Sequence, residues 1–285
     1  MKTAFLLPAL HLIERPARHG VEPHDAWQWS WEPTVIAGVT LLVIAYLCAV
    51  GPLRARFALA GEPDPVVVLL FLLGSLVLLL SLVSPLEVLS DSYLFSAHMV
   101  QHILIALIVP LLWLLGTPGW LLRPLIRPRA VTAVARVLSF PIAAFLIFNV
   151  NFWLWHLPPL YDLALADERV HIFQHLTFIS TGLLNWFPVL SPLHEVARIS
   201  YPLQVLYLFA SCQPGVALGA ILVFSRGVLY QAYAAAPRLF DLSPHTDQQI
   251  GGLIMWIPGN AIYLLALSAI FIRWFQGGAV EGGRV

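Results

Sequence analysis

Two histidine motifs contain the residues whose types and spacing are best suited to chemistry. Each has the pattern His-x-x-Gln-His: one runs from His98 to His102 and the other from His171 to His175. On a helix, residues four apart lie on the same face, about one turn from each other. Each motif therefore points two imidazoles in similar directions, and imidazole is the commonest metal-binding side chain. The repeated motif predicts a site for one or two transition-metal ions, or for a haem.

The elements that carry these motifs are predicted to be membrane-spanning helices. Mean hydropathy is +0.82, 59% of residues are hydrophobic and 11% are charged, whereas soluble domains average about 25% charged residues. Apolar stretches reach the length of about 20 residues that crosses a bilayer, and in lipid such stretches must be helical. We therefore predict an all-α polytopic membrane bundle of about seven transmembrane helices. The expected spans are residues 34–50, 66–83, 94–115, 138–156, 170–190, 202–224 and 250–274.

The distribution of charge predicts the orientation of this bundle. Nine of the 15 basic residues fall on the side that includes the loop between the third and fourth spans. The positive-inside rule then places the N-terminus outside and the C-terminus in the cytoplasm. Eleven of the 15 acidic residues lie on the outer side, where they would attract cations. We expect an extracytoplasmic tail at residues 1–33, one transmembrane domain at 34–275 and a cytoplasmic tail at 276–285.

This topology gathers the candidate ligands near the outer membrane face. The third and fifth spans both run inward, so both histidine pairs lie near the outer ends of their helices. His156 ends the outward-running fourth span, and Asp247 precedes the seventh; these two are the secondary candidates. The predicted metal ligands are His98, His102, His171, His175, His156 and Asp247.

Other polar residues at the same end are candidates for holding the ligands in place. A carboxylate often accepts the second ring N–H of a ligating histidine and thereby fixes its tautomer. Glutamine is a weak ligand and is better suited to hydrogen bonding around the site. The candidates for this supporting role are Gln101, Gln174, Asp91, Asp162, Asp167 and Gln248.

Four motifs, in this order along the chain, give the sequence a family resemblance. They are His98-x-x-Gln101-His102, Trp155-His156-x-Pro158-x-x-Tyr161-Asp162, His171-x-x-Gln174-His175 and Asp247-Gln248-Gln249-x-Gly251-Gly252-x-x-Met255-Trp256. On a seven-span chain this set resembles the CtaG family of bacterial cytochrome c oxidase assembly factors. The resemblance is not to the single-span copper chaperone of the same name, whose soluble β-domain and cysteine pair have no counterpart here.

The resemblance implies a non-enzymatic role in maturing a haem-copper oxidase in the bacterial inner membrane. A copper ion is the cofactor it implies. The expected partners are cytochrome c oxidase subunits or other copper chaperones, in the lipid bilayer and with no nucleic acid. Imidazole also accepts zinc and iron, so ligand chemistry alone leaves the metal open.

Other functions use comparable residues. A membrane di-iron oxygenase also uses His-x-x-x-His pairs, but this chain lacks a His-x-x-His-His motif. A b-type haem protein would take one axial histidine from each pair and leave the other idle, unless two haems bind. A zinc protease would need the general base of His-Glu-x-x-His, which neither pair contains. The haem protein and the di-iron enzyme are the alternatives that we retain.

Overall fold

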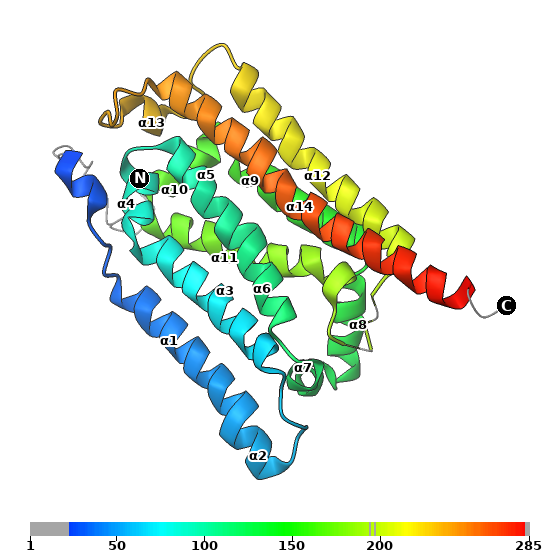
Figure 1. Cartoon of the computed structure of the whole chain (residues 1–285). Helices are drawn as coiled ribbons and strands as arrows, with labels where there is room; N and C mark the ends of the chain where they lie inside the picture. Colours follow the sequence, from blue (N-terminus) through cyan, green and yellow to red (C-terminus); the bar gives the residue numbers. More distant parts are fainter. Residues whose placement is uncertain (1–22, 194, 197, 283–285) are drawn as a thin grey trace, which may run out of the picture.

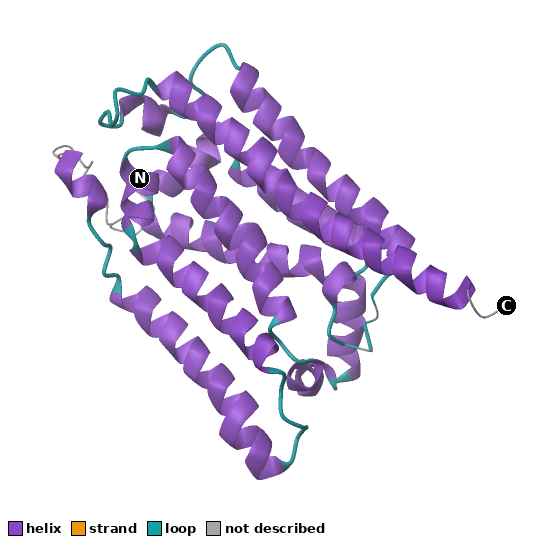
Figure 2. Ribbon diagram, in the orientation of Figure 1, coloured by secondary structure: helices purple, strands orange, loops and turns teal. Residues whose placement is uncertain are grey.

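A computed structural model of the chain describes residues 23–193, 195–196 and 198–282, and every regular element in these ranges is helical (Figure 2). The prediction of an all-α bundle is confirmed. Residues 1–22, most of the expected N-terminal tail, lie outside the described residues.

The first part of the chain forms two long antiparallel helical segments that pack together (Figure 1). The first segment begins at a proline, whose missing backbone N–H breaks no helical hydrogen bond at that position. The second is capped by Asp64, whose carboxylate accepts a hydrogen bond from the Val66 N–H at 2.8 Å. The segments are η1 (Pro23–Trp27), α1 (Pro33–Cys48), the π-helical η2 (Ala49–Leu53), α2 (Arg54–Phe57) and α3 (Pro65–Val83).

The next helical segment carries the first histidine motif and contains a π-helical turn in its middle. Pro110 has no N–H to donate within the helix, and a π-helical turn occurs just before it. Trp186, on the later helix α11 (Glu168–Leu190), donates its indole N–H to the Leu107 carbonyl at 3.1 Å, which satisfies a backbone acceptor there. The segments are α4 (Pro85–Ser92), α5 (Phe95–Ile103), η3 (Leu104–Ile108) and α6 (Val109–Leu115).

The second histidine motif lies on α11, which packs against α6, η3 and α9. Gly182 makes this approach possible, because a Cβ there would lie 2.2 Å from the Ala106 carbonyl oxygen. Before α11 the chain bends by 68° between α8 and α9. The segments are α7 (Gly119–Ile126), α8 (Arg129–Leu138), α9 (Pro141–Trp155), α10 (Pro158–Ala166) and α11 (Glu168–Leu190).

Two long helices complete the bundle and lie side by side along one edge of it (Figure 1). Gly219 and Gly252 face each other at their crossing, where a Cβ on Gly219 would lie 2.8 Å from the Gly252 carbonyl oxygen. Small residues at such crossings let helix backbones approach closely in membranes. The segments are α12 (Tyr201–Phe224), α13 (Gln231–Ala235) and α14 (Pro244–Gly282).

Five described helices have the length and apolar composition to cross a membrane, or up to six if the bent pair α8–α9 is one span. The 23-residue α11 is long enough but is not among them, because its histidines, glutamine and asparagine lower its hydropathy. The chain is therefore a multi-pass membrane protein. The count of seven spans and the orientation of the termini stay predictions.

Candidate metal centre

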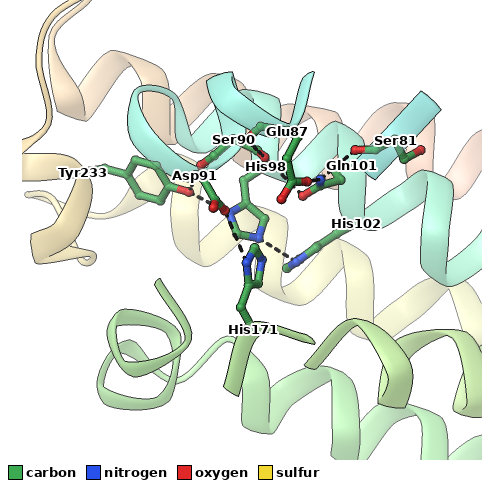
Figure 3. A network of polar contacts seen from close by, with 9 residues as sticks. All are labelled: Ser81, Glu87, Ser90, Asp91, His98, Gln101, His102, His171 and Tyr233. Atoms are coloured by element: carbon green, nitrogen blue, oxygen red, sulfur yellow. Dashed lines mark hydrogen bonds and ion pairs between the residues drawn. The ribbon is translucent and has the colours of Figure 1, made fainter. Parts of the chain in front are cut away.

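The structure brings both histidine pairs together inside one end of the bundle. One ligand atom from each of His98, His102, His171 and His175 can be chosen so that all four lie within 4.8 Å of one another. We call these four residues the imidazole cluster. All four are buried, and Figure 3 shows three of them between α4, α5 and α11.

The helical spacing of the motifs produces this arrangement. Within each pair the two ring centroids are 4.2 Å apart. Across the helices, His98 is 5.3 Å from His171 and His102 is 5.7 Å from His175, again between centroids. A tetrahedral ion with bonds of about 2.0–2.1 Å needs ligand atoms roughly 3.4 Å apart. Since the chosen ligand atoms lie up to 4.8 Å apart, the widest separation has to shorten by at most about 1.4 Å to hold one ion.

The tautomer of His98 is fixed by a tyrosine from another part of the chain. Tyr233 on α13 donates its hydroxyl hydrogen to the Ser90 carbonyl at 2.5 Å and lies 2.7 Å from Nδ1 of His98. Because that hydrogen is already used, the tyrosine oxygen accepts from His98 Nδ1–H. Burial also raises the pKa of Tyr233, so its hydroxyl stays protonated. His98 therefore presents the lone pair of Nε2 to the cluster.

His102 donates to that lone pair. Its Nε2 lies 2.7 Å from Nε2 of His98, so its proton fills the position that an ion would take. This separation is shorter than the roughly 3.4 Å between ligands of one ion. Binding must therefore shift this proton to Nδ1 of the same imidazole and part the two rings. Nδ1 of His102 has no hydrogen-bond partner among the described residues.

The second pair has a carboxylate behind it. Nδ1 of His171 lies 3.3 Å from Oδ1 of Asp91, and both side chains are buried. A carboxylate at Nδ1 favours the tautomer that leaves the lone pair on Nε2. The neighbouring His175 is 8% exposed, and its Nε2 has no hydrogen-bond partner in the described part of the chain. The predicted supporting role of Asp91 therefore matches its position.

Gln101 connects three helices behind the cluster. Its amide nitrogen donates to the Ser81 carbonyl at 2.8 Å and to the Glu87 carboxylate, and its oxygen accepts from the Ser90 hydroxyl at 3.2 Å. Glu87 was not singled out from the sequence, although it lies one helical turn before Asp91. Glu87, Asp91 and His171 form a second group whose ligand atoms lie within 4.8 Å of one another (Figure 3).

His156 lies beside the cluster rather than within it. Its ring centroid is 5.9 Å from that of His102, and its Nδ1 lies 2.7 Å from the Phe152 carbonyl. Its Nε2 has no hydrogen-bond partner among the described residues. Both rings line a small apolar cavity of about 60 Å³, which Met99 and Met255 also line. Gln174 is fully buried on the face that carries His171, and neither of its polar side-chain atoms has a partner within the described ranges.

The remaining predicted residues form hydrogen bonds with backbone groups instead. Asp247 accepts hydrogen bonds from the N–H groups of Phe95 and Ser96, at 2.7 and 3.1 Å, and so caps α5. Its carboxylate is thereby committed to the helix that carries the first pair and is not in the imidazole cluster. Three others also bond to backbone: Asp162 to the Ala232 N–H, Asp167 to the Arg169 N–H, and Gln248 to the Leu229 N–H and the Leu222 carbonyl.

Buried aromatic residues close the cluster on the α13 side. Phe95 stacks on Tyr230 at 4.9 Å, and Tyr161 lies 5.2 Å from His98, between ring centroids. Burial raises the pKa of Tyr161, so it too is a neutral phenol. Tyr233 belongs to this group, and no sequence signal places it beside His98, because it lies on the short helix α13, 135 residues further along the chain.

The chain also matches a known protein family over most of its length. The family model described as cytochrome c oxidase caa3 assembly factor, Caa3_CtaG, matches residues 44–277. The chain belongs to this family. The match includes both histidine motifs and every residue of the imidazole cluster, and it confirms the resemblance seen in the sequence.

Curated relatives of this Caa3_CtaG chain are longer proteins. It is 25% identical over 263 residues to uncharacterized protein Mb0105 of Mycobacterium bovis and to uncharacterized protein MT0111 of Mycobacterium tuberculosis. It is 24% identical over 261 residues to uncharacterized protein ML1998 of Mycobacterium leprae. Each alignment covers 86% of this chain but 39% of the relative. No solved structure matches the chain.

Proposed function

We propose that this protein assists the assembly of a haem-copper oxidase by binding a copper ion at the imidazole cluster, in the bacterial inner membrane. It acts as a carrier rather than as an enzyme. The observation that carries the proposal is the convergence of four buried imidazoles from two helices within 4.8 Å. Copper is the cargo, and oxidase subunits or other copper chaperones are the partners.

The donor set suits a copper ion that must be released again. Imidazole binds both Cu(I) and Cu(II). In the protein, the hydrogen bond between His98 and His102 competes with the ion, because an ion has to displace the shared proton. Binding therefore gives up a buried hydrogen bond, and its loss opposes the free energy of metal binding. A site with such a built-in competitor binds less tightly than a preformed one, which favours transfer to an acceptor.

An ion fits the described residues better than a haem does. A haem would take one axial imidazole from each pair with the macrocycle between them, whereas the ring centroids across the helices are 5.3 Å apart for His98 and His171 and 5.7 Å apart for His102 and His175. The cavity next to His102 and His156 has a volume of about 60 Å³, too little for a macrocycle. The absorption spectrum of the purified protein separates the two cases, since a b-type haem would give a Soret band.

The test is oxidase maturation in cells whose own copy of this gene is replaced. A His102→Ala and His175→Ala double variant removes one ligand from each helix. We expect normal amounts of the membrane protein, with oxidase subunits present but poor in copper and inactive. Full oxidase activity in this strain would overturn the proposal.

His245→Ala is the matched control. His245 lies at the same end of the bundle, but its Nε2 lies 2.9 Å from the Ser225 carbonyl, outside the imidazole cluster. The control should support wild-type oxidase activity. Equal loss in the control would mean that the phenotype does not come from the cluster.

A further inference from the structure

A cavity of about 300 Å³ is lined both by residues at the beginning of α1 and by two members of the imidazole cluster. Its walls come from α1, α3, α4 and α11, and its lining includes Ser30 and Glu32 just before α1 and His171 and His175 on α11. Glu32 is exposed, whereas both imidazoles are buried. The cavity thus joins the surface of the protein to two members of the cluster.

Acidic side chains lie along this cavity. Glu32, Glu87, Asp91 and Glu168 all line it, and no basic side chain does among the described residues. A cleft lined by one sign of charge with low-dielectric walls concentrates ions of the opposite sign. The cavity therefore favours cations over anions.

The inner end of the cavity has ligands of its own. Glu87, Asp91 and His171 have ligand atoms within 4.8 Å of one another, and His171 also belongs to the imidazole cluster. His175 lines the same cavity, is 8% exposed and has an Nε2 that no described residue binds. A cation at the carboxylates would thus be next to the imidazoles that hold it more firmly.

We propose that this cavity is the access route for the metal cation, and that Glu87, Asp91 and His171 form a transfer site from which it passes to the imidazole cluster. The step is an exchange of ligands: carboxylate oxygens leave the cation as imidazole nitrogens bind it, with no change of oxidation state. The proposal rests on the proposed function, since it needs an ion at the cluster.

The first test is the rate of copper loading into the purified full chain, measured after mixing with Cu(II) sulfate. Glu87→Gln keeps an oxygen that can accept from Gln101 but removes the charge. We expect loading to slow about tenfold at low ionic strength, since steering by charge raises association rates about 10- to 1,000-fold. The final copper content should equal that of the wild type. Wild-type loading in Glu87→Gln would overturn the transfer site.

Asp241→Asn is the control for charge. Asp241 is an exposed acid that does not line the cavity, and its φ of 53° is one that asparagine also adopts readily. We expect wild-type loading in this control. An equal slowing would show that overall charge, not the cavity, sets the rate.

The second test blocks the cavity without touching a charged residue. Gly38 on α1 lines it, and a Cβ added there meets no atom within 4 Å, so Gly38→Leu places a side chain in open space. Gly51→Leu is the matched control, because Gly51 is equally open but is not part of the lining. We expect about tenfold slower loading in the first and normal loading in the second. Equal rates in both would overturn the route.

These experiments also separate this proposal from the proposed function. If the wild-type protein binds no copper at the imidazole cluster, both fail. If the wild-type binds copper and both Glu87→Gln and Gly38→Leu load at its rate, the access route alone fails.

Discussion

Tyr233→Phe removes a single oxygen atom that is predicted to set the copper affinity of the imidazole cluster. That oxygen accepts from Nδ1 of His98 at 2.7 Å and donates to the Ser90 carbonyl at 2.5 Å. The phenylalanine ring keeps the packing against Phe95, whose centroid lies 5.7 Å away. Without the hydroxyl, His98 is no longer held in the tautomer that presents Nε2 to the ion.

The magnitude follows from the two lost hydrogen bonds. Removing a partner that orients a ligating histidine typically costs about 10- to 100-fold in metal affinity, or about 1.4–2.8 kcal/mol. The buried Ser90 carbonyl also loses its donor, which lowers the free energy of unfolding by about 1–3 kcal/mol. Both effects should be present in the same variant.

The assay is a competition titration of purified protein against a copper chelator, with Tyr230→Phe as the control. Tyr230 is equally buried and donates its hydroxyl hydrogen to the His156 carbonyl at 3.0 Å, but it bonds to no imidazole ring. The control should lose stability and retain copper affinity. Wild-type affinity in Tyr233→Phe, or an equal loss in Tyr230→Phe, would refute the role of the hydroxyl.

Three further predictions concern the support of the cluster. Asp91→Asn should weaken copper binding about tenfold in the same titration, because a neutral amide holds Nδ1–H of His171 less strongly; unchanged affinity would contradict this. Asp247→Asn should retain copper affinity and lower the free energy of unfolding by about 1 kcal/mol, since its amide oxygen accepts only one of the two α5 N–H groups; a large loss of affinity would make Asp247 a ligand after all. Gly182→Ala should destabilise by at least about 1–3 kcal/mol in thermal unfolding, because its Cβ would meet the Ala106 carbonyl, whereas Gly61→Ala, in open space, should be neutral.

Much of the fold follows from the sequence because the apolar stretches leave little choice but helix. The expected spans at 66–83 and 202–224 nearly coincide with α3 (Pro65–Val83) and α12 (Tyr201–Phe224). The π-helical turns and the 68° bend between α8 and α9 could not be predicted in detail. At η3, for example, the π-helical turn is accompanied by the hydrogen bond from Trp186 to the Leu107 carbonyl, which joins residues 79 apart.

The pairing of the histidines was predictable because residues four apart lie on the same face of any helix. The residues that hydrogen-bond to these histidines and support their helices were not predictable, because they come from segments distant in the sequence. Asp247 illustrates this: its position before the expected seventh span suggested a metal ligand, yet it lies in the first turn of α14 and its carboxylate caps α5. Tyr233 lies beside His98 because the segment between α12 and α14, which includes α13, folds back over the cluster.

X-ray absorption of the copper-loaded protein identifies the atoms that bind the ion. We expect imidazole nitrogens around copper in the wild type, and no bound copper in a variant with all four cluster histidines changed to alanine. A first shell of sulfur, or an unchanged spectrum in the fourfold variant, would contradict it.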